Sequence, residues 1–160
     1  MINFKTVTKD DIDRISNFRM ILLKNTKSHY GSNDNKLLSD IKNSFKLWME
    51  KNLNSDEVHF VMSENENNEV VSIGIGIIDT RAPIIGALNG KSGWISSLIV
   101  NPDYRNHGVG KVTLNHLLKW FYSNEISKIV LHSTEEGETL YEKSGFIKDN
   151  EQIFIKNILK

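Results

Sequence analysis

Residues 98–110 read Leu98-Ile99-Val100-Asn101-Pro102-Asp103-Tyr104-Arg105-Asn106-His107-Gly108-Val109-Gly110. The apolar run over 94–100 predicts a strand, and the apolar spacing over 108–122 predicts a helix directly after the loop. Backbone N–H groups at a helix N-terminus lack partners and carry partial positive charge. Gly108 and Gly110 would let an anion approach the backbone without meeting a Cβ atom. The segment therefore predicts an anion site, best suited to phosphate, with Arg105 and Lys111 as sources of direct charge.

Two better-known phosphate loops fit this segment poorly. A P-loop needs G-x-x-x-x-G-K-[ST], but Arg105 stands at the first glycine and Val112 at the Ser/Thr position. A dinucleotide fingerprint needs G-x-G-x-x-G, and Thr113 replaces its third glycine. A purely structural alternative stays open at this point, in which the glycines only turn the strand into the helix.

Strand and helix patterns cover the rest of the chain. Strands are predicted over residues 2–7, 58–63, 70–79, 126–132 and 152–159, the last with 146–148 as a candidate partner. Helices are predicted after the capping-box pattern Thr8-Lys9-Asp10-Asp11, from near Asp34, and over 136–143. Gly74 and Gly76 share one face of a strand, where glycines indicate a bend or a close backbone approach. The order β-α-α-β-β-β-α-β-α-β predicts a mixed α/β or α+β layer fold, in one domain spanning residues 1–160.

The composition is that of an ordinary globular protein, with 39% hydrophobic and 25% charged residues in a chain of 160. Lys plus Arg equals Asp plus Glu at 20 each, so the net charge provides no general attraction to nucleic acid or to an anionic membrane. The absence of cysteine excludes disulfides, thiolate metal sites and a cysteine nucleophile. No apolar run reaches 18 residues and the start lacks a signal-peptide pattern, so we expect a cytoplasmic protein without a membrane partner.

Two motifs resemble the signatures of the GNAT superfamily of acetyltransferases. The first is a strand, then [RQ]-x-x-G-x-[GA], then a helix, and residues 105–110 match it after the approach V-x-P-x-[YF]-R at 100–105. The second is L-Y-x-x-x-G-F, which is matched by Leu140-Tyr141-Glu142-Lys143-Ser144-Gly145-Phe146. The two motifs stand in the family's order and at about its spacing. The resemblance is tight from about Trp94 to Phe146 and architectural before that.

The resemblance implies an α+β fold with a mixed, mostly antiparallel central sheet, two splayed parallel strands and flanking helices. It also implies acetyl-CoA as cosubstrate and no metal. The strand before the loop would hold the pantetheine arm and the loop amides the pyrophosphate. The implied cofactor contacts are Leu98, Ile99, Val100, Arg105, Asn106, His107, Gly108, Val109, Gly110, Lys111 and Thr134. Thr134 stands where many relatives carry an Asn, and its hydroxyl keeps a donor and an acceptor.

The implied reaction is direct transfer of an acetyl group to an amine. Tyr141 resembles the family's general acid for the leaving thiolate, because a phenol is protonated at neutral pH; the alternative is that it only packs over the cofactor. Residues 93–98 carry no acid to serve as the base. His132 is a candidate base or substrate contact, although its side chain could equally support the fold. A water held by a strand serine is the other route for the proton.

The acceptor is expected to be a small-molecule or peptide amine, which the sequence does not identify further. Residues 29–35, between the two early helices, are a candidate specificity segment, with Arg19, Tyr30 and Trp94 as candidate pocket walls, whereas Phe45 and Trp48 are assigned to the core. An edge strand near the C-terminus could pair in a homodimer. Two alternatives to the enzyme stay open: a non-catalytic acetyl-CoA-binding sensor, and a phosphate-binding domain unrelated to acyl transfer.

Overall fold

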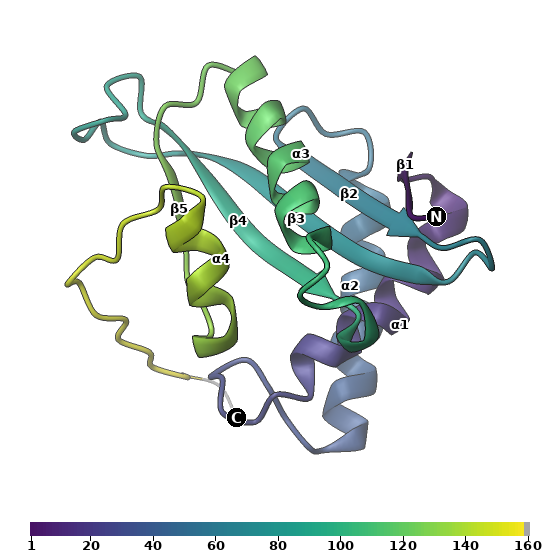
Figure 1. The fold of residues 1–160 in the computed structure, drawn as a ribbon. Coiled ribbons are helices and arrows are strands. Elements are labelled where there is room, and N and C mark those ends of the chain that lie inside the picture. The colour runs from purple at the N-terminus through teal and green to yellow at the C-terminus, as the bar shows by residue number, and fades with distance from the viewer. Residues whose placement is uncertain (159–160) are drawn as a thin grey trace.

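A five-stranded mixed sheet with the order β1-β2-β3-β4-β5 forms the centre of the protein (Figure 1). The computed structural model describes residues 1–158. The strands are β1 (Asn3–Thr6), β2 (Val58–Glu64), β3 (Val70–Thr80), β4 (Lys91–Val100) and β5 (Ile129–Leu131). Neighbouring strands from β1 to β4 pair antiparallel, while β4 and β5 pair parallel. The predicted sheet, mostly antiparallel with one parallel pair, is confirmed.

Helices cover both faces of this sheet (Figure 1). One face carries α1 (Ile12–Leu23) and α2 (Asn35–Asn52), and the other carries α3 (Val109–Ser123), with α4 (Glu138–Lys143) beside β5. Three short 3-10 helices, η1 (Lys9–Asp11), η2 (Pro102–Tyr104) and η3 (Glu135–Gly137), precede α1, α3 and α4. Within residues 1–158, none of the helices combines the length and apolar character that a membrane crossing requires.

The sheet separates two hydrophobic clusters. Side chains of α1 and α2 pack with Ile73 and Ile75 on one face, and side chains of α3 pack on the other. Gly74 and Gly76 alternate with Ile73, Ile75 and Ile77 along β3 and face α3. A Cβ atom at either glycine would lie 3.0 Å from a side-chain carbon of Leu117 or Phe121. The predicted close approach at these glycines is confirmed, because α3 packs almost directly on the strand backbone.

The C-terminal part of the chain departs from the sequence prediction. No strand forms over residues 144–158. Within the described residues, the prediction of a strand over 152–159 is therefore wrong, and so is its candidate partner at 146–148. Leu159 lies outside the described residues. Phe154 and Ile158 are 92% and 83% exposed instead. Apolar periodicity alone does not form a strand, because the stabilising ladder comes from a partner edge. The edges of the sheet are β1 and β5, so the homodimer predicted through a C-terminal edge strand loses its structural basis.

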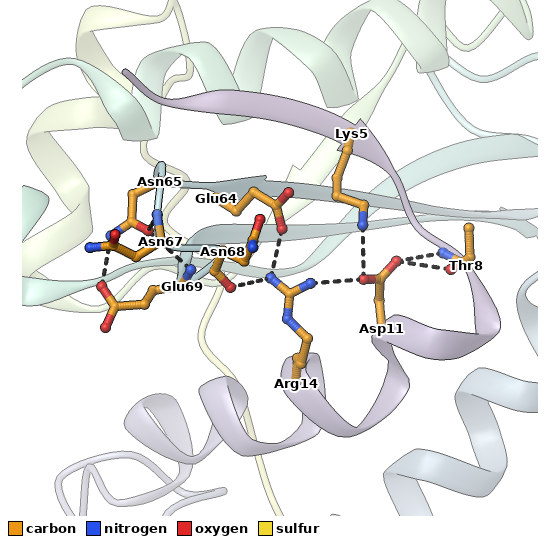
Figure 2. Close-up of polar contacts among 9 residues, drawn as sticks. All are labelled: Lys5, Thr8, Asp11, Arg14, Glu64, Asn65, Asn67, Asn68 and Glu69. Carbon is orange, nitrogen blue, oxygen red and sulfur yellow. Dashed lines mark hydrogen bonds and ion pairs between the residues drawn. The ribbon is translucent and has the colours of Figure 1, made fainter.

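A polar cluster centred on Asp11 ties the start of α1 to the sheet (Figure 2). The Asp11 carboxylate accepts from the backbone N–H of Thr8 at 2.9 Å, as the capping-box pattern predicts, and from Lys5 Nζ at 3.1 Å. Arg14 donates to Asp11 at 3.2 Å and to Glu64 at the end of β2 at 2.6 Å. Burial acts to raise the pKa of Asp11, but the hydrogen bonds from Thr8 and Lys5 outweigh it and hold the pKa below its usual value.

Replacing Asp11 by Asn is expected to lower the free energy of unfolding by about 2–3 kcal/mol at pH 7, because Asp11 is 2% exposed and its partners lose a charged acceptor. Urea unfolding measures the change. The folded pKa lies below the unfolded value of about 3.9, so the stabilisation is present above that pH and fades as the pH falls through the folded value. Asp10→Asn, at an exposed neighbour, should change stability by less than about 0.5 kcal/mol; equal losses in the two variants would contradict the assignment.

Candidate functional site

The parallel strands β4 and β5 pair over a short stretch and then separate. Gly93 to Ile95 pair with Ile129 to Leu131, and β4 continues to Val100 without a strand on that side among residues 1–158. The separation begins beside a bulge, where Ser96 is inserted between the residues that pair with Ile75 and Gly76. A bulge bends its strand and increases the local twist. The splayed pair that the family resemblance implies is therefore present, and it opens at Ser96.

Backbone groups of β4 line the opening between the two strands. Asn101 donates its N–H to the Val71 carbonyl at 2.8 Å, which makes these two residues a hydrogen-bonded pair of the antiparallel ladder. Because such pairs alternate, the backbone of Ile99 is directed toward β3, while Leu98 and Val100 are directed toward β5. The Val100 carbonyl accepts from Arg105 Nε at 3.3 Å. We therefore expect the strand contacts predicted for residues 98–100 to come from Leu98 and Val100, with Ile99 engaged in the sheet.

The glycine loop joins β4 to α3 at the same end of the gap. Asn106 and Gly108 have φ angles of 63° and 82°, and α3 begins at Val109 directly after Gly108. A Cβ atom at Gly108 would meet nothing within 4 Å, so this glycine borders open space. A Cβ atom at Gly110 would instead lie 3.3 Å from Leu140 Cδ2. The two glycines differ in role: Gly108 allows an outside group to approach the loop, and Gly110 allows α4 to pack on α3.

Side chains of the loop connect it to the segment across the gap. Arg105 Nη1 lies 3.5 Å from Glu136 Oε2 in η3, so an exposed ion pair joins the loop to the segment that precedes α4. His107 Nδ1 lies 2.7 Å from the Arg105 carbonyl oxygen, which folds the imidazole back onto its own loop. Lys111 is exposed in the first turn of α3. The loop thus presents cationic side chains around the backbone N–H groups that begin α3.

A buried chain of hydroxyl groups holds the first turn of α3 against the sheet. Ser63 Oγ lies 2.6 Å from Ser72 Oγ, which lies 2.7 Å from Thr113 Oγ1. Thr113 in turn donates to the Val109 carbonyl at 2.9 Å. All three hydroxyl residues are buried. In the sequence, Thr113 was noted only because it departs from a dinucleotide motif. The signal that pointed to the hydroxyl chain was the presence of hydroxyl residues at inward positions of two apolar strands.

Tyr141 lies on α4 with its ring packed edge-on to Phe146, at 5.7 Å between ring centroids. Burial, with a smaller contribution from the charge of Tyr30, raises the pKa of Tyr141 to about 12. The phenol therefore stays protonated throughout the neutral range. A Cβ atom built on Gly137 would lie 3.2 Å from Tyr141 Cε2 and 3.7 Å from Thr134 Oγ1. Two residues predicted for the site thus approach one another around Gly137.

His132 follows β5 and is exposed, with its ring centroid 5.7 Å from that of Trp94 on β4. Ile129 and Leu131 pack in the cluster beneath α3, so alternation along β5 directs His132 to the opposite face. Trp94 lies on the same face, since its neighbour Ile95 packs toward α3. The two side chains therefore flank the opening on the face that carries α1 and α2.

A cavity of about 520 Å³ lies on that face, between α1, α2 and the sheet. Its lining residues are Arg19 from α1, Leu37, Asp40, Ile41, Ser44, Phe45 and Trp48 from α2, Ile75 from β3 and Ser96 from β4. Ser96 marks the bulge, so the cavity reaches the point where β4 and β5 separate. Phe45 and Trp48 do pack in the core cluster, as predicted, but they also form a wall of the cavity. Asp40 was not identified from the sequence, because an acid on an amphipathic helix is typical of a solvated face.

The loop between α1 and α2 also belongs to this region. Burial lowers the pKa of Arg19 and raises that of Tyr141, and the charge of Tyr30 makes a smaller upward contribution to both, so Tyr30 lies within electrostatic range of each. The sequence proposed residues 29–35 as a specificity segment and Arg19 and Tyr30 as wall residues. The structure brings Arg19 to the cavity and Tyr30 near both Arg19 and Tyr141. Trp94 is not among the residues that line the cavity.

Comparisons with known proteins agree with this architecture. The sequence model of the acetyltransferase (GNAT) family matches residues 23–146. Two red-algal proteins named uncharacterized N-acetyltransferase ycf52 are similar in sequence. The protein from Porphyra purpurea is 38% identical over 61 residues, 38% of this chain and 35% of its own length. The protein from Pyropia yezoensis is 34% identical over 89 residues, 52% and 51% of the two chains. The matched regions thus span about a third to a half of these relatives.

A solved structure from Clostridium acetobutylicum, described as a predicted acetyltransferase with acetyl-CoA, has the same fold. It superposes with a TM-score of 0.83 and 20% sequence identity, covering 98% of this chain and 96% of that one. At this level of identity, the likeness concerns the fold.

Proposed function

Because the chain belongs to the acetyltransferase (GNAT) family, we propose that it is an acetyl-CoA-dependent N-acetyltransferase, which transfers the acetyl group directly to a primary amine of a small molecule or peptide. The observation that carries the proposal is the coincidence of three features: the splayed strands, the open glycine loop and a protonated tyrosine. Each would serve a different part of one reaction, and all three adjoin one gap.

The chemistry of the groups around the gap supports acetyl-CoA as the donor. The outward backbone groups of Leu98 and Val100 would hydrogen-bond the amides of the pantetheine arm, as a neighbouring strand does. The N–H groups at the start of α3 would hold the pyrophosphate, which Gly108 allows to approach closely. Arg105 and Lys111 would supply positive charge, and Thr134 would offer a hydroxyl beside Tyr141. The same family name on a relative and acetyl-CoA in the description of the Clostridium structure support this assignment.

In the proposed reaction, an ammonium group first loses one proton to become a nucleophilic amine. The amine nitrogen forms a bond to the thioester carbonyl carbon, and the carbon–sulfur bond then breaks with its electron pair on sulfur. The thiolate takes the proton of Tyr141, and the nitrogen releases its second proton, which restores the phenol through solvent. The products are an amide and free CoA thiol, so the neutral amine and thioester react without net change in protons.

His132 is the proposed acceptor of the proton that the ammonium must lose. It lies beside Trp94 on the sheet face that carries α1 and α2. It is also exposed, so it can pass the proton on to solvent. The Ser97 hydroxyl, which is buried without a hydrogen-bond partner among residues 1–158, could hold a water on the same path. Neither group needs to be strongly basic, because the proton is delivered to bulk water.

Thiol release from acetyl-CoA in the presence of an amine panel tests the proposal. The panel should contain amino acids, peptide N-termini, polyamines and aminoglycosides, with calorimetry of CoA binding alongside. Release that depends on one class of amine is the expected result. Tight CoA binding with no release for any amine would instead favour the alternative, a non-catalytic acetyl-CoA sensor. Absence of CoA binding would contradict both.

A further inference from the structure

Arg19 is a half-buried cation in the cavity beside the splayed strands, and its Nε donor is buried without a partner among residues 1–158. Its guanidinium carbon lies 4.5 Å from the centre of the Phe45 ring. Its Nε atom is buried and has no hydrogen-bond partner, and no Asp or Glu oxygen lies within 4.0 Å of the guanidinium, in the described part of the chain. Burial lowers the pKa of Arg19 from its ordinary value. The arginine therefore has neither a counter-charge nor an acceptor from residues 1–158.

The stacking on Phe45 does not satisfy this guanidinium. An aromatic ring covers one face of the cation, whereas all five N–H donors point outward in the guanidinium plane. The buried Nε donor is unfavourable without an acceptor, and the half-buried charge is less well solvated than one at the open surface. A planar carboxylate supplies both the acceptors and the counter-charge. Its two oxygens accept hydrogen bonds in the guanidinium plane, and together they carry one negative charge.

The rest of the cavity is mainly apolar, and it determines which chemical group the ligand would carry besides the carboxylate. Leu37, Ile41, Trp48 and Ile75 supply aliphatic and aromatic walls. Asp40 also lines the cavity, but it is exposed, and neither of its carboxylate oxygens lies within 4.0 Å of an Arg19 nitrogen, so the two residues form no salt bridge. Arg19 is the one cationic residue of the lining, which suits a monoanion better than a doubly charged phosphate.

From these contacts we infer that the acceptor is an apolar amine that also carries a carboxylate, which Arg19 binds, as in an apolar amino acid. This inference rests on the proposed acetyltransferase function and specifies its acceptor. The carboxylate would lie against Arg19, the apolar group against Trp48 and its neighbours, and the amine toward Ser96, where the strands separate. The volume of about 520 Å³ is within the range of pockets that hold small molecules of this kind.

Matched pairs of acceptors that differ only in the carboxylate test the inference. L-phenylalanine is compared with phenethylamine, L-tryptophan with tryptamine, and L-leucine with 3-methylbutylamine, by kcat/KM for thiol release. For at least one pair, the acid should be preferred about 10- to 100-fold, the scale of a charge-assisted hydrogen bond. A wild-type protein that acetylates the decarboxylated amines as fast as the acids would overturn the inference.

Variants of Arg19 separate substrate recognition from general damage. Arg19→Met, which keeps the stem, should lower kcat/KM for the acids about 10- to 100-fold and leave the decarboxylated amines within about threefold. Arg19→Lys should restore part of the preference, and Lys51→Met, at an exposed position of α2 outside the lining, should leave it intact. Equal losses on acids and amines in Arg19→Met would show a structural role and contradict the inference. Calorimetry of CoA binding checks that each variant is folded.

A binding measurement keeps the inference separate from the proposed function. L-phenylalanine, L-tryptophan and L-leucine are titrated into the protein–CoA complex by calorimetry. Binding to the wild type that is lost in Arg19→Met supports the carboxylate site, even if no amine is acetylated. If other amines are acetylated while none of these acids binds or reacts, the proposed function stands and the acceptor inference is wrong.

Discussion

Replacing Tyr141 by Phe should lower kcat about 10²- to 10⁴-fold, the range measured for loss of a general acid. The phenylalanine keeps the ring that packs against Phe146, so the affinity for CoA should change little. What is lost is the proton that the thiolate would otherwise receive. Single-turnover thiol release with saturating acetyl-CoA and amine measures the effect on the chemical step.

Because the pKa of Tyr141 is raised, the pH dependence of the rate provides a second, independent test. Since the pKa is about 12, the acid form is present from neutral pH to well above pH 10. The rate should therefore not fall with Tyr141 deprotonation until the pH approaches that value. Tyr122→Phe, at an exposed position of α3, is the matched control and should leave kcat unchanged. A normal rate in Tyr141→Phe would remove this residue from the mechanism.

Replacing Gly108 by Val should weaken CoA binding about 10²- to 10³-fold. The new side chain would project into the open space beside the loop, where the proposed pyrophosphate lies, and would remove one or two charge-assisted hydrogen bonds. The φ angle of 82° also disfavours a β-branched residue at this position. Calorimetric titration with CoA measures the loss.

Gly145 provides the control for backbone strain. It has a φ angle of 90°, and a Cβ atom there would also meet nothing within 4 Å, but it follows α4 rather than preceding α3. Gly145→Val should therefore cost comparable stability, as measured by urea unfolding, while CoA affinity stays near the wild-type value. If the two variants lost CoA affinity equally, strain rather than occupation of the anion site would explain the effect at Gly108.

Much of the candidate donor site was predictable because its signals are local. The strand–loop–helix at residues 91–123 depends on a strand end, positive φ angles and a helix start, each specified within a few residues, and all were predicted in the right order. The capping box at Thr8 and the strands predicted over residues 58–63 and 70–79 were confirmed for the same reason. Tyr141 and Thr134 came from the family resemblance, and the structure places both beside Gly137.

Features that depend on contacts between residues distant in the sequence were not predicted. The apolar alternation after residue 146 predicted a strand, but strand formation depends on a partner edge, and no pairing occurs there within the described residues. Gly110 looked like a phosphate-loop glycine, yet its neighbour is Leu140 of α4. The hydroxyl chain through Thr113 joins residues 41 positions apart, which no local pattern reports.

By itself, the sequence determined the order of the first nine elements, the glycine loop and the family. Local backbone preferences and side-chain periodicity are sufficient for the elements and the loop, whereas the family came from the resemblance of the two motifs at residues 100–110 and 140–146. The tertiary structure alone decided where β4 and β5 separate and which backbone groups of β4 face the gap. It also decided that Arg19 lies half-buried over Phe45 with its Nε donor unpartnered among residues 1–158. These features depend on contacts between α1, α2 and the sheet, and such contacts arise only when distant segments pack together.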